Sequence, residues 1–304
     1  MMTDRTDARP DLYMLPGIST ALRDLLAARF TLHRENPPPT TRAVVGGGSS
    51  IVDVALLDQL PALEIIAIHG VGYDGIDLAA AKARGVAVTT TPDVLTDDVA
   101  DLAIGLMLAV QRRIVTNERV VRDGGWQVDL ARRASGRRIG IFGLGRIGKA
   151  IAKRAAPFAS DVHYTARSAK VGFDGVFHAD IASLATACDV LIIAAPGGGG
   201  THHVVDADVL SALGEDGILV NIARGSLVDE PALVAALQAG TIAGAGLDVF
   251  ADEPAVPEAL KAMDQVVLSP HQGSATVDGR AAMAALVIAN LDAHFAGQPL
   301  LTPL

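Results

Sequence analysis

Short apolar runs, each ended by glycine, proline or polar residues, recur along the first hundred positions of the chain. They predict strands at residues 11–15, 42–46, 65–69 and 86–90, and a helical pattern covers residues 20–29. Runs of this length between turn residues are typical of buried strands. Because strands alternate with helices, we expect a parallel sheet that is covered by helices on both faces.

A second series of the same kind follows a longer helical pattern. That pattern begins at Thr96, with Asp97 and Asp98 at positions that the helix dipole favours, and it runs on to Arg112 and Arg113. Further helices are expected at residues 149–158 and 280–295. The expected strands of this series lie at residues 138–142, 162–165, 190–194, 217–222, 243–248 and 265–268. The chain is therefore predicted to be an α/β protein.

Length and charge narrow the class of protein. A chain of 304 residues corresponds to two domains of about 150 residues, or to one large one. Half of the residues are hydrophobic and 19% are charged, which excludes intrinsic disorder as the main state. The formal net charge of −9 argues against a general nucleic-acid binder, because phosphate binding needs clustered Lys and Arg.

Because Cys188 is the single cysteine, a disulfide within the chain and a four-cysteine zinc site are both excluded. We expect no bound metal. Cys188 precedes an apolar strand, so we interpret it as a small buried thiol. The first residues lack the apolar segment of a signal peptide, and the apolar stretches are too short to span a bilayer. We expect a cytoplasmic protein without a membrane partner.

A G-x-G-x-x-G motif at Gly143, Gly145 and Gly148 stands directly after a predicted strand and before a predicted helix. In a dinucleotide-binding fold the first glycine permits a tight turn, the second lets the backbone approach the pyrophosphate, and the third allows the helix to pack on the strand. The pyrophosphate would lie at the helix N-terminus, where unpaired N–H groups favour an anion. The motif therefore predicts a dinucleotide site, and an ordinary glycine turn is the alternative.

The end of the next predicted strand indicates which dinucleotide binds. No carboxylate follows residues 162–165 to hold a ribose 2′-hydroxyl, and Asp161 comes before that strand. Arg167, Ser168 and Lys170 follow instead, and their donors suit a 2′-phosphate. We therefore expect NADPH or NADP⁺, with NADH as the weaker alternative; the competing interpretation is a solvated basic turn.

Three further segments place polar groups at predicted strand ends, where doubly wound sheets bind ligands. They are residues 221–225, 246–254 and 269–274, and they contribute Arg224, Glu253 and His271. Because the strands are successive, these side chains are candidates for one shared site.

Taken together, these segments resemble the D-isomer-specific 2-hydroxyacid dehydrogenase family, and the resemblance covers about residues 15–304. Within that family the chain is most similar to glyoxylate/hydroxypyruvate reductases and hydroxyphenylpyruvate reductases. The resemblance also includes Gly70-Val71-Gly72-Tyr73-Asp74-Gly75-Ile76-Asp77, Thr91 to Asp101, and the ending Pro299 to Pro303.

The resemblance implies two Rossmann-like or flavodoxin-like domains with doubly wound parallel sheets and an active-site cleft between the domains. Residues 1–97 and 287–304 would form the substrate-binding domain, and residues 98–286 the NAD(P)-binding Rossmann domain. Family members are usually homodimers. Trp126 resembles a position in the interdomain or dimer-contact segment, with ordinary packing as the alternative.

The resemblance also implies the roles of the site residues. Arg224 would bind the substrate carboxylate and carbonyl, since a guanidinium donates two parallel hydrogen bonds. His271 would protonate the carbonyl oxygen, and Glu253 would orient His271. The backbone N–H groups of Val71 and Gly72 would hold the carboxylate.

The cofactor contacts that follow from the glycine motif, the basic turn and the resemblance are expected from residues at the strand ends: Thr96, Gly143, Leu144, Gly145, Arg146, Ile147, Gly148, Arg167, Ser168, Lys170, Pro196, Ile222, Ala223, Arg224, Asp248, His271 and Gly273. Two features depart from the family pattern. Gly197 to Gly200 replace the usual loop after Pro196, and His69 precedes the glycine loop, where a substrate contact and a structural role are both open.

The favoured activity is an NADPH-dependent reduction of small 2-oxo acids, glyoxylate or hydroxypyruvate, to D-2-hydroxy acids. An aromatic substrate of the hydroxyphenylpyruvate type is the nearest alternative. A different class of protein, a dinucleotide-sensing scaffold of the corepressor type, would bind cofactor without turnover. A 3-phosphoglycerate dehydrogenase would need additional cations for the substrate phosphate.

Overall fold

The computed structural model describes residues 9–304, which belong to two compact units. Among the described residues, the first unit comprises residues 9–95 and Thr276–Leu304, and the second comprises Thr96–Ala275. The boundary expected at residue 287 falls inside a continuous helix, α11 (Val277–Phe295), and the structure divides the chain before that helix begins. That the first unit binds the substrate and the second binds NAD(P) stays a prediction.

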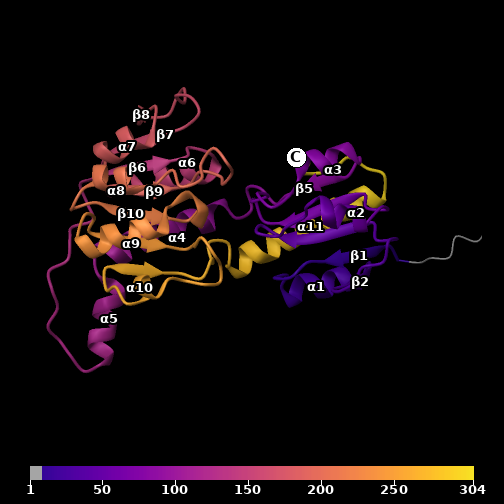
Figure 1. The fold of residues 1–304 in the computed structure, drawn as a ribbon, viewed down its shortest axis with the longest axis horizontal. Helices are drawn as coiled ribbons and strands as arrows, with labels where there is room; N and C mark the ends of the chain where they lie inside the picture. Colours follow the sequence, from indigo (N-terminus) through magenta and orange to yellow (C-terminus); the bar gives the residue numbers. More distant parts are fainter. Residues whose placement is uncertain (1–8) are drawn as a thin grey trace, which may run out of the picture. The chain divides into compact units, whose positions relative to one another are not determined.

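The first unit is built on a five-stranded parallel sheet in the order β2-β1-β3-β4-β5 (Figure 1). Its strands are β1 (Asp11–Met14), β2 (Thr31–His33), β3 (Ala43–Gly47), β4 (Ile65–His69) and β5 (Ala87–Thr89). Its helices are α1 (Thr20–Ala27), α2 (Val54–Gln59), α3 (Leu78–Ala83) and α11. This strand order is that of flavodoxin-like doubly wound sheets.

The period of two along each strand distributes the core of the first unit between the two faces of its sheet. Along β4, Ile65 and Ala67 pack with α1 and α11, whereas Ile66 and Ile68 pack with α2 and α3. All four residues are buried. A strand buried on both faces appears in the sequence as an unbroken apolar run, which is why residues 65–69 were predicted to the residue.

The second unit is built on a seven-stranded parallel sheet in the order β12-β11-β10-β9-β6-β7-β8. Its strands are β6 (Arg137–Phe142), β7 (Ala159–Thr165), β8 (Val176–His178), β9 (Val190–Ile193), β10 (Ile218–Asn221), β11 (Gly244–Leu247) and β12 (Val266–Leu268). The order reverses between β6 and β9, as in Rossmann folds. Ligands bind such sheets at the carboxyl ends of the strands beside this reversal.

Helices cover both faces of the second sheet. One face carries α7 (Ile181–Ala187), α8 (Ala207–Leu213) and α9 (Glu230–Ala239), which pack on Leu191, Leu219 and Leu247. The other face carries α4 (Thr96–Gln111) and α6 (Arg146–Ala155). The remaining short helices are α5 (Ile114–Arg122), α10 (Glu258–Lys261) and the 3₁₀ turn η1 (Gly225–Leu227).

The only cysteine lies in the core of the second unit, as expected. Cys188 is buried beneath β6, where a Cβ at Gly140 would stand 2.7 Å from its sulfur. Burial raises the pKa of the Cys188 thiol to about 12.

Several expected boundaries were wrong for identifiable reasons. The helix expected at 149–158 begins at Arg146, because Gly145 is its N-cap. The long helix ends at Gln111 rather than at Arg113, since Arg113 takes a left-handed conformation and α5 begins after it. Asp161 lies within β7 rather than before it.

The edge strands β2 and β8 were not predicted from the sequence. Each has only three residues, and none of the six is buried. A short, half-exposed segment lacks both an apolar run and a clear alternation, so neither signal was available.

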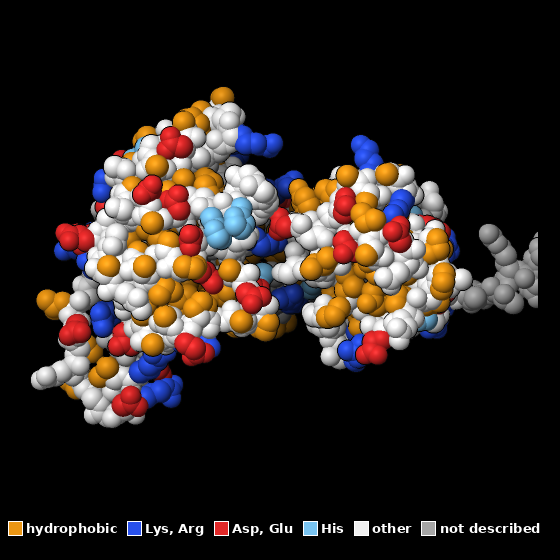
Figure 2. Space-filling view, viewed as in Figure 1, with side chains coloured by type: hydrophobic (Ala, Val, Ile, Leu, Met, Phe, Trp, Pro, Cys, Tyr) orange, Lys and Arg blue, Asp and Glu red, His pale blue; other side chains and the backbone are white. Residues whose placement is uncertain are grey.

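The described residues contain no helix that is long and apolar enough to cross a membrane. On the face shown in Figure 2, acidic and basic side chains are interspersed over each unit. The protein has the predicted α/β class, with two parallel doubly wound sheets.

Candidate functional site

The glycine motif lies at the point of the second sheet where the strand order reverses. Gly143 follows β6 in a left-handed conformation, with φ of 103°, and a Cβ there would stand 2.6 Å from the backbone of Ala195. A Cβ at Gly148 would collide with the carbonyl oxygen of Gly143. Both positions therefore require glycine, one for the turn and one for the contact between α6 and β6.

Gly145 differs from these two glycines, because neither its backbone conformation nor its neighbours exclude a side chain. It caps α6 in an extended conformation with no side-chain cap, and a Cβ added there would meet no described atom within 4 Å. The first turn of α6 therefore has no side-chain acceptor from its N-cap, and the space over Gly145 is open. A helix N-terminus of this kind binds phosphate groups through its backbone N–H groups and its dipole.

The basic residues expected for a 2′-phosphate follow the carboxyl end of β7, next to the glycine motif in the sheet order. Arg167 and Ser168 are exposed in a bend, and among residues 9–304 no carboxylate pairs with Arg167. The backbone N–H of Lys170 donates to the hydroxyl of Tyr164 over 2.8 Å, which fixes the turn. The guanidinium of Arg167 is thus free to meet an anion.

Arg224 lies in a short loop after β10 that its own neighbours shape. The Asn221 side chain donates to the carbonyl of Arg224 over 2.8 Å and accepts from the N–H of Ala223 over 3.0 Å. Next in the chain, a Cβ at Gly225 would collide with the carbonyl carbon of Phe250. The loop therefore packs directly on the backbone after β11, three residues ahead of Glu253.

Glu253 and His271 form a hydrogen-bonded pair at this edge of the sheet. Nδ1 of His271 lies 2.7 Å from Oε2 of Glu253, whose Oε1 accepts from the backbone N–H of Phe250 over 3.0 Å. Burial acts to raise the pKa of Glu253, but the hydrogen bonds from His271 and Phe250, with the positive charges of His271 and Arg224, outweigh it and lower that pKa. Glu253 is therefore held as a carboxylate.

Asp248 holds the loop that carries His271. Its buried carboxylate accepts from the Ser269 hydroxyl over 2.5 Å and from the backbone N–H groups of Gln272 and Gly273 over 2.8 and 2.9 Å. The N–H of His271 in turn donates to the Asp248 carbonyl over 2.8 Å. His271 has a positive φ of 51°, uncommon for a residue other than glycine, and these bonds hold it there. This anchoring role was not predicted from the sequence.

The expected substrate loop belongs to the first unit. Gly70, Val71 and Gly72 follow β4, beside a second glycine-rich turn, residues 46–50, at the end of β3. In that turn the Ser50 hydroxyl accepts from the N–H of Gly47 over 2.8 Å. Three glycines and two serines after an apolar strand are a signal that could have identified this turn.

The expected site residues thus fall into groups set by the sheets. In the second unit the glycine motif, Arg167, Arg224, Glu253 and His271 all lie at the carboxyl edge of one parallel sheet, and Arg224 is close enough to Glu253 to influence its pKa. Thr96 begins α4, and the loop from Pro196 is closed by the Thr201 hydroxyl, which donates to the Pro196 carbonyl over 3.0 Å. The remaining expected cofactor contacts lie at this same edge, with Leu144, Ile222, Ala223 and Gly273 in loops and Arg146 and Ile147 in the first turn of α6.

Comparison with known proteins gives the same assignment independently. Residues 104–273 match the family model of the D-isomer specific 2-hydroxyacid dehydrogenase, NAD binding domain. A hydroxyphenylpyruvate reductase of Plectranthus scutellarioides is 48% identical, with 95% of this chain and 97% of that protein aligned. A 2-ketogluconate reductase of Gluconobacter oxydans is 45% identical over 97% of this chain and 99% of that protein.

A solved structure shows the same overall likeness. The NADPH-dependent glyoxylate/hydroxypyruvate reductase of Sinorhizobium meliloti, crystallised with NADP and malonate, is 43% identical, and it matches with a TM-score of 0.91 over 98% of this chain and 97% of that one. The sequence matches span nearly all of the chain, and the structural match shows that the fold is also shared. The chain belongs to the D-isomer-specific 2-hydroxyacid dehydrogenases.

Proposed function

We propose that the protein is an NADPH-dependent reductase of small 2-oxo acids, with glyoxylate and hydroxypyruvate as the favoured substrates and D-2-hydroxy acids as products. The observation that carries the proposal is the pair formed by His271 and Glu253, 2.7 Å apart, at the sheet edge that also holds Arg224 and the glycine motif. That edge therefore combines a proton donor, a cation for a carboxylate and a dinucleotide cradle.

The residues present fit a dinucleotide. The turn at Gly143, the uncapped start of α6 and the open space over Gly145 together make a cradle for a pyrophosphate, which a side chain at Gly145 would fill. The backbones of Leu144, Arg146 and Ile147 would hold the pyrophosphate. When bound, the reduced nicotinamide supplies a hydride.

The preference for NADPH rests on the turn after β7. Arg167 is exposed and without a carboxylate partner in residues 9–304, Ser168 adds a hydroxyl, and no acid stands at the strand end where NAD enzymes hold a ribose hydroxyl. The relative from Sinorhizobium meliloti, which was crystallised with NADP, supports the same cofactor.

The substrate would be held by its carboxylate. Asn221 and Gly225 fix the backbone at Arg224, and Nη1 of its guanidinium donates to the Ala223 carbonyl over 2.7 Å. A guanidinium is permanently charged and has five N–H donors, which suits the carboxylate and the neighbouring carbonyl oxygen. The backbone N–H groups of Val71 and Gly72 would complete the carboxylate site.

His271 would supply the proton. Because Nδ1 faces the Glu253 carboxylate, it carries a hydrogen in that bond, and Nε2 is the nitrogen left to give a proton to the carbonyl oxygen. The pKa of Glu253 is lowered, so Glu253 stays a carboxylate and holds the orientation of the His271 ring before and after the proton has left.

The test is a reductase assay with glyoxylate, hydroxypyruvate, pyruvate and hydroxyphenylpyruvate, each with NADPH and with NADH. We expect the highest kcat/KM with glyoxylate or hydroxypyruvate and NADPH. Comparable rates with both cofactors would contradict the cofactor proposal. A preference for hydroxyphenylpyruvate would replace the substrate proposal with the aromatic alternative, which the Plectranthus relative favours. Cofactor binding without any turnover would revive the scaffold alternative.

We also propose a homodimer formed through the arm that follows α4. Trp126 is 86% exposed and Leu130 is 99% exposed, and α5 adds Ile114 and Val121, which are more than half exposed. Figure 1 shows α5 and the segment after it extending away from the sheet of the second unit. Large apolar side chains gathered on one exposed segment are typical of an interaction surface. A cytoplasmic location stays a prediction.

A further inference from the structure

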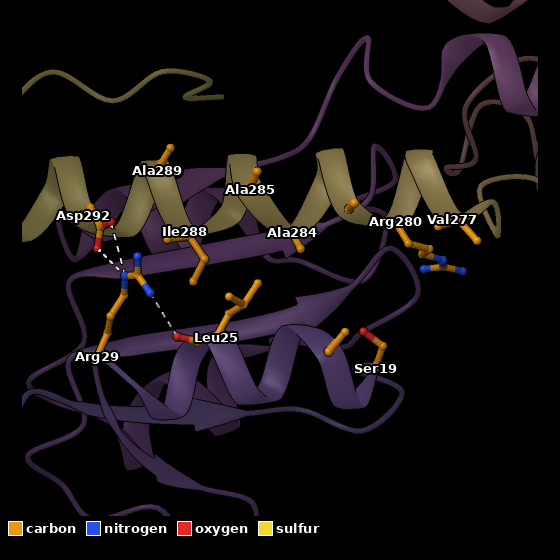
Figure 3. Close-up of a pocket in the computed structure, with 12 residues that line it drawn as sticks. Ser19, Leu25, Arg29, Val277, Arg280, Ala284, Ala285, Ile288, Ala289 and Asp292 are labelled. Carbon is orange, nitrogen blue, oxygen red and sulfur yellow. Dashed lines mark hydrogen bonds and ion pairs between the residues drawn. The ribbon is translucent and has the colours of Figure 1, made fainter.

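A groove of about 710 Å³ in the first unit runs between α1 and α11 and has an arginine at each end (Figure 3). Its walls are mainly small and apolar, including Leu25, Ala284 and Ile288. At one end Arg29 pairs with Asp292 over 3.3 Å and donates to the Leu25 carbonyl. Arg280 lies at the opposite end, and no carboxylate of the described residues forms an ion pair with it. The two arginines of this groove therefore differ in whether a carboxylate neutralises them.

The surroundings of Arg280 are unfavourable for a cation. The side chain is half-buried, and it lies four residues into α11, near the positive end of the helix dipole. Burial lowers the pKa of the guanidinium, and no carboxylate among residues 9–304 offsets this. Asp278 is exposed and stands two positions away, a spacing at which helical side chains do not face each other. A half-buried charge without a counter-charge is costly unless an anion joins it.

The polar contact that the structure gives the Arg280 guanidinium is His69, at the end of β4. Nη1 of Arg280 lies 3.5 Å from Nδ1 of His69, whose side chain is buried. An arginine can only donate, so Nδ1 accepts, and the neutral ring carries its hydrogen on Nε2. That Nε2 is buried and has no hydrogen-bond partner in the described part of the chain. His69 therefore orients the guanidinium but cannot neutralise it.

His69 connects this arginine to the expected substrate loop. Gly70, Val71 and Gly72 follow His69 without a break, and the end of β4 lies beside the glycine-rich turn after β3. Ligands of open α/β sheets bind at these carboxyl ends. An anion bound to the backbone N–H groups after His69 would supply the counter-charge for Arg280.

On the basis of the function proposed above, we propose that Arg280, positioned by His69, is a specificity-determining residue that binds the carboxylate of the 2-oxo acid together with the backbone of Val71 and Gly72. His69, Arg280 and the loop at Val71 and Gly72 all belong to the first unit, so this anion site is formed within that unit. Its expected effect is selection of acids over uncharged 2-oxo compounds.

The test compares pyruvate with methyl pyruvate, which has the same reducible carbonyl but no carboxylate. We expect Arg280→Gln to raise KM for pyruvate about tenfold to hundredfold, with a smaller change in kcat, because a charge-assisted hydrogen bond is lost. The same change should leave kcat/KM for methyl pyruvate nearly unchanged. Arg280→Lys should restore part of the affinity, and His69→Phe should show an intermediate loss.

Arg29→Gln is the matched control, because it removes the arginine at the other end of the same groove and should not alter the ratio of acid to ester. Thermal unfolding of each variant checks that it is folded. Equal losses with pyruvate and methyl pyruvate in Arg280→Gln would show a structural role and overturn the inference, and so would equal activity with wild type.

Malonate binding separates this inference from the proposed function. Malonate has carboxylates but no reducible carbonyl, so its binding to the full chain, measured by titration calorimetry, does not depend on turnover. We expect weaker binding to Arg280→Gln than to the wild type and Arg29→Gln. Equal affinities, or no binding to the wild type, would overturn the inference even if the reductase activity is found. If no 2-oxo acid is reduced but malonate binding still depends on Arg280, the proposed function fails and the anion site stands.

Discussion

At the scale of single residues, two acidic residues keep His271 in place. Its ring is held by Glu253, and its backbone by Asp248 in a left-handed conformation. We expect His271→Asn to lower kcat by about 10²- to 10⁴-fold, the usual contribution of a general acid. Cofactor affinity, measured by quenching of NADPH fluorescence, should change little. Near-normal turnover would remove His271 from the mechanism.

Glu253 links the site to pH. Its folded-state pKa is lowered, so its ionised form stabilises the fold above the unfolded-state pKa of about 4.3, and this contribution is lost as the pH falls through the folded-state pKa. The free energy of unfolding of the wild type should therefore exceed that of Glu253→Gln at about pH 7, and the difference should shrink towards about pH 3. Denaturant titrations at both pH values measure the free energy of unfolding. A difference that is the same at both pH values would contradict a lowered pKa of Glu253.

Arg167 tests the cofactor preference. Replacing it with alanine removes an exposed guanidinium without disturbing a described ion pair. We expect KM for NADPH to rise about tenfold or more, because a charge-assisted bond to the 2′-phosphate is lost, while KM for NADH stays close to the wild-type value. Equal changes for both cofactors would mean that Arg167 does not contact the 2′-phosphate.

At the scale of elements, we expect replacement of glycine by alanine to have opposite effects on stability at two positions. Gly225→Ala would push a Cβ into the backbone of Phe250, so it should displace the Arg224 loop and lower both kcat/KM and the melting temperature. Gly105 lies exposed in the middle of α4 with open space around it. Gly105→Ala should stabilise the protein by up to about 1 kcal/mol, because alanine favours helix. Thermal unfolding and the reductase assay distinguish the two.

The elements also show what could be predicted from the sequence. Buried strands such as β4 were predicted because both faces of the strand are apolar, and the strand ends then placed Arg224, Glu253 and His271 at one edge. The anchoring by Asp248 could not be predicted, since it depends on a turn formed 21 residues later along the chain. The direction of His69 could not be predicted either, because an unbroken apolar run does not show which face a residue takes.

At the scale of the whole molecule, the exposed arm after α4 determines the oligomer that we expect. Trp126→Asp places a charge on the apolar segment without disturbing the core, since the side chain is almost fully exposed. The wild type should sediment as a dimer and the variant should shift towards the monomer in analytical ultracentrifugation. Val171→Asp, at an exposed position outside the arm, is the control. An unchanged distribution in both variants would place the interface elsewhere.

The buried sulfur beneath β6 has a practical consequence for these measurements. Because the chain has one cysteine and its thiol stays protonated and covered, alkylating reagents should leave the native protein untouched. A cysteine introduced on the surface would then be the single reactive thiol. Dyes or spin labels attached to each of the two units in turn could therefore follow ligand-induced movement without removing any native residue.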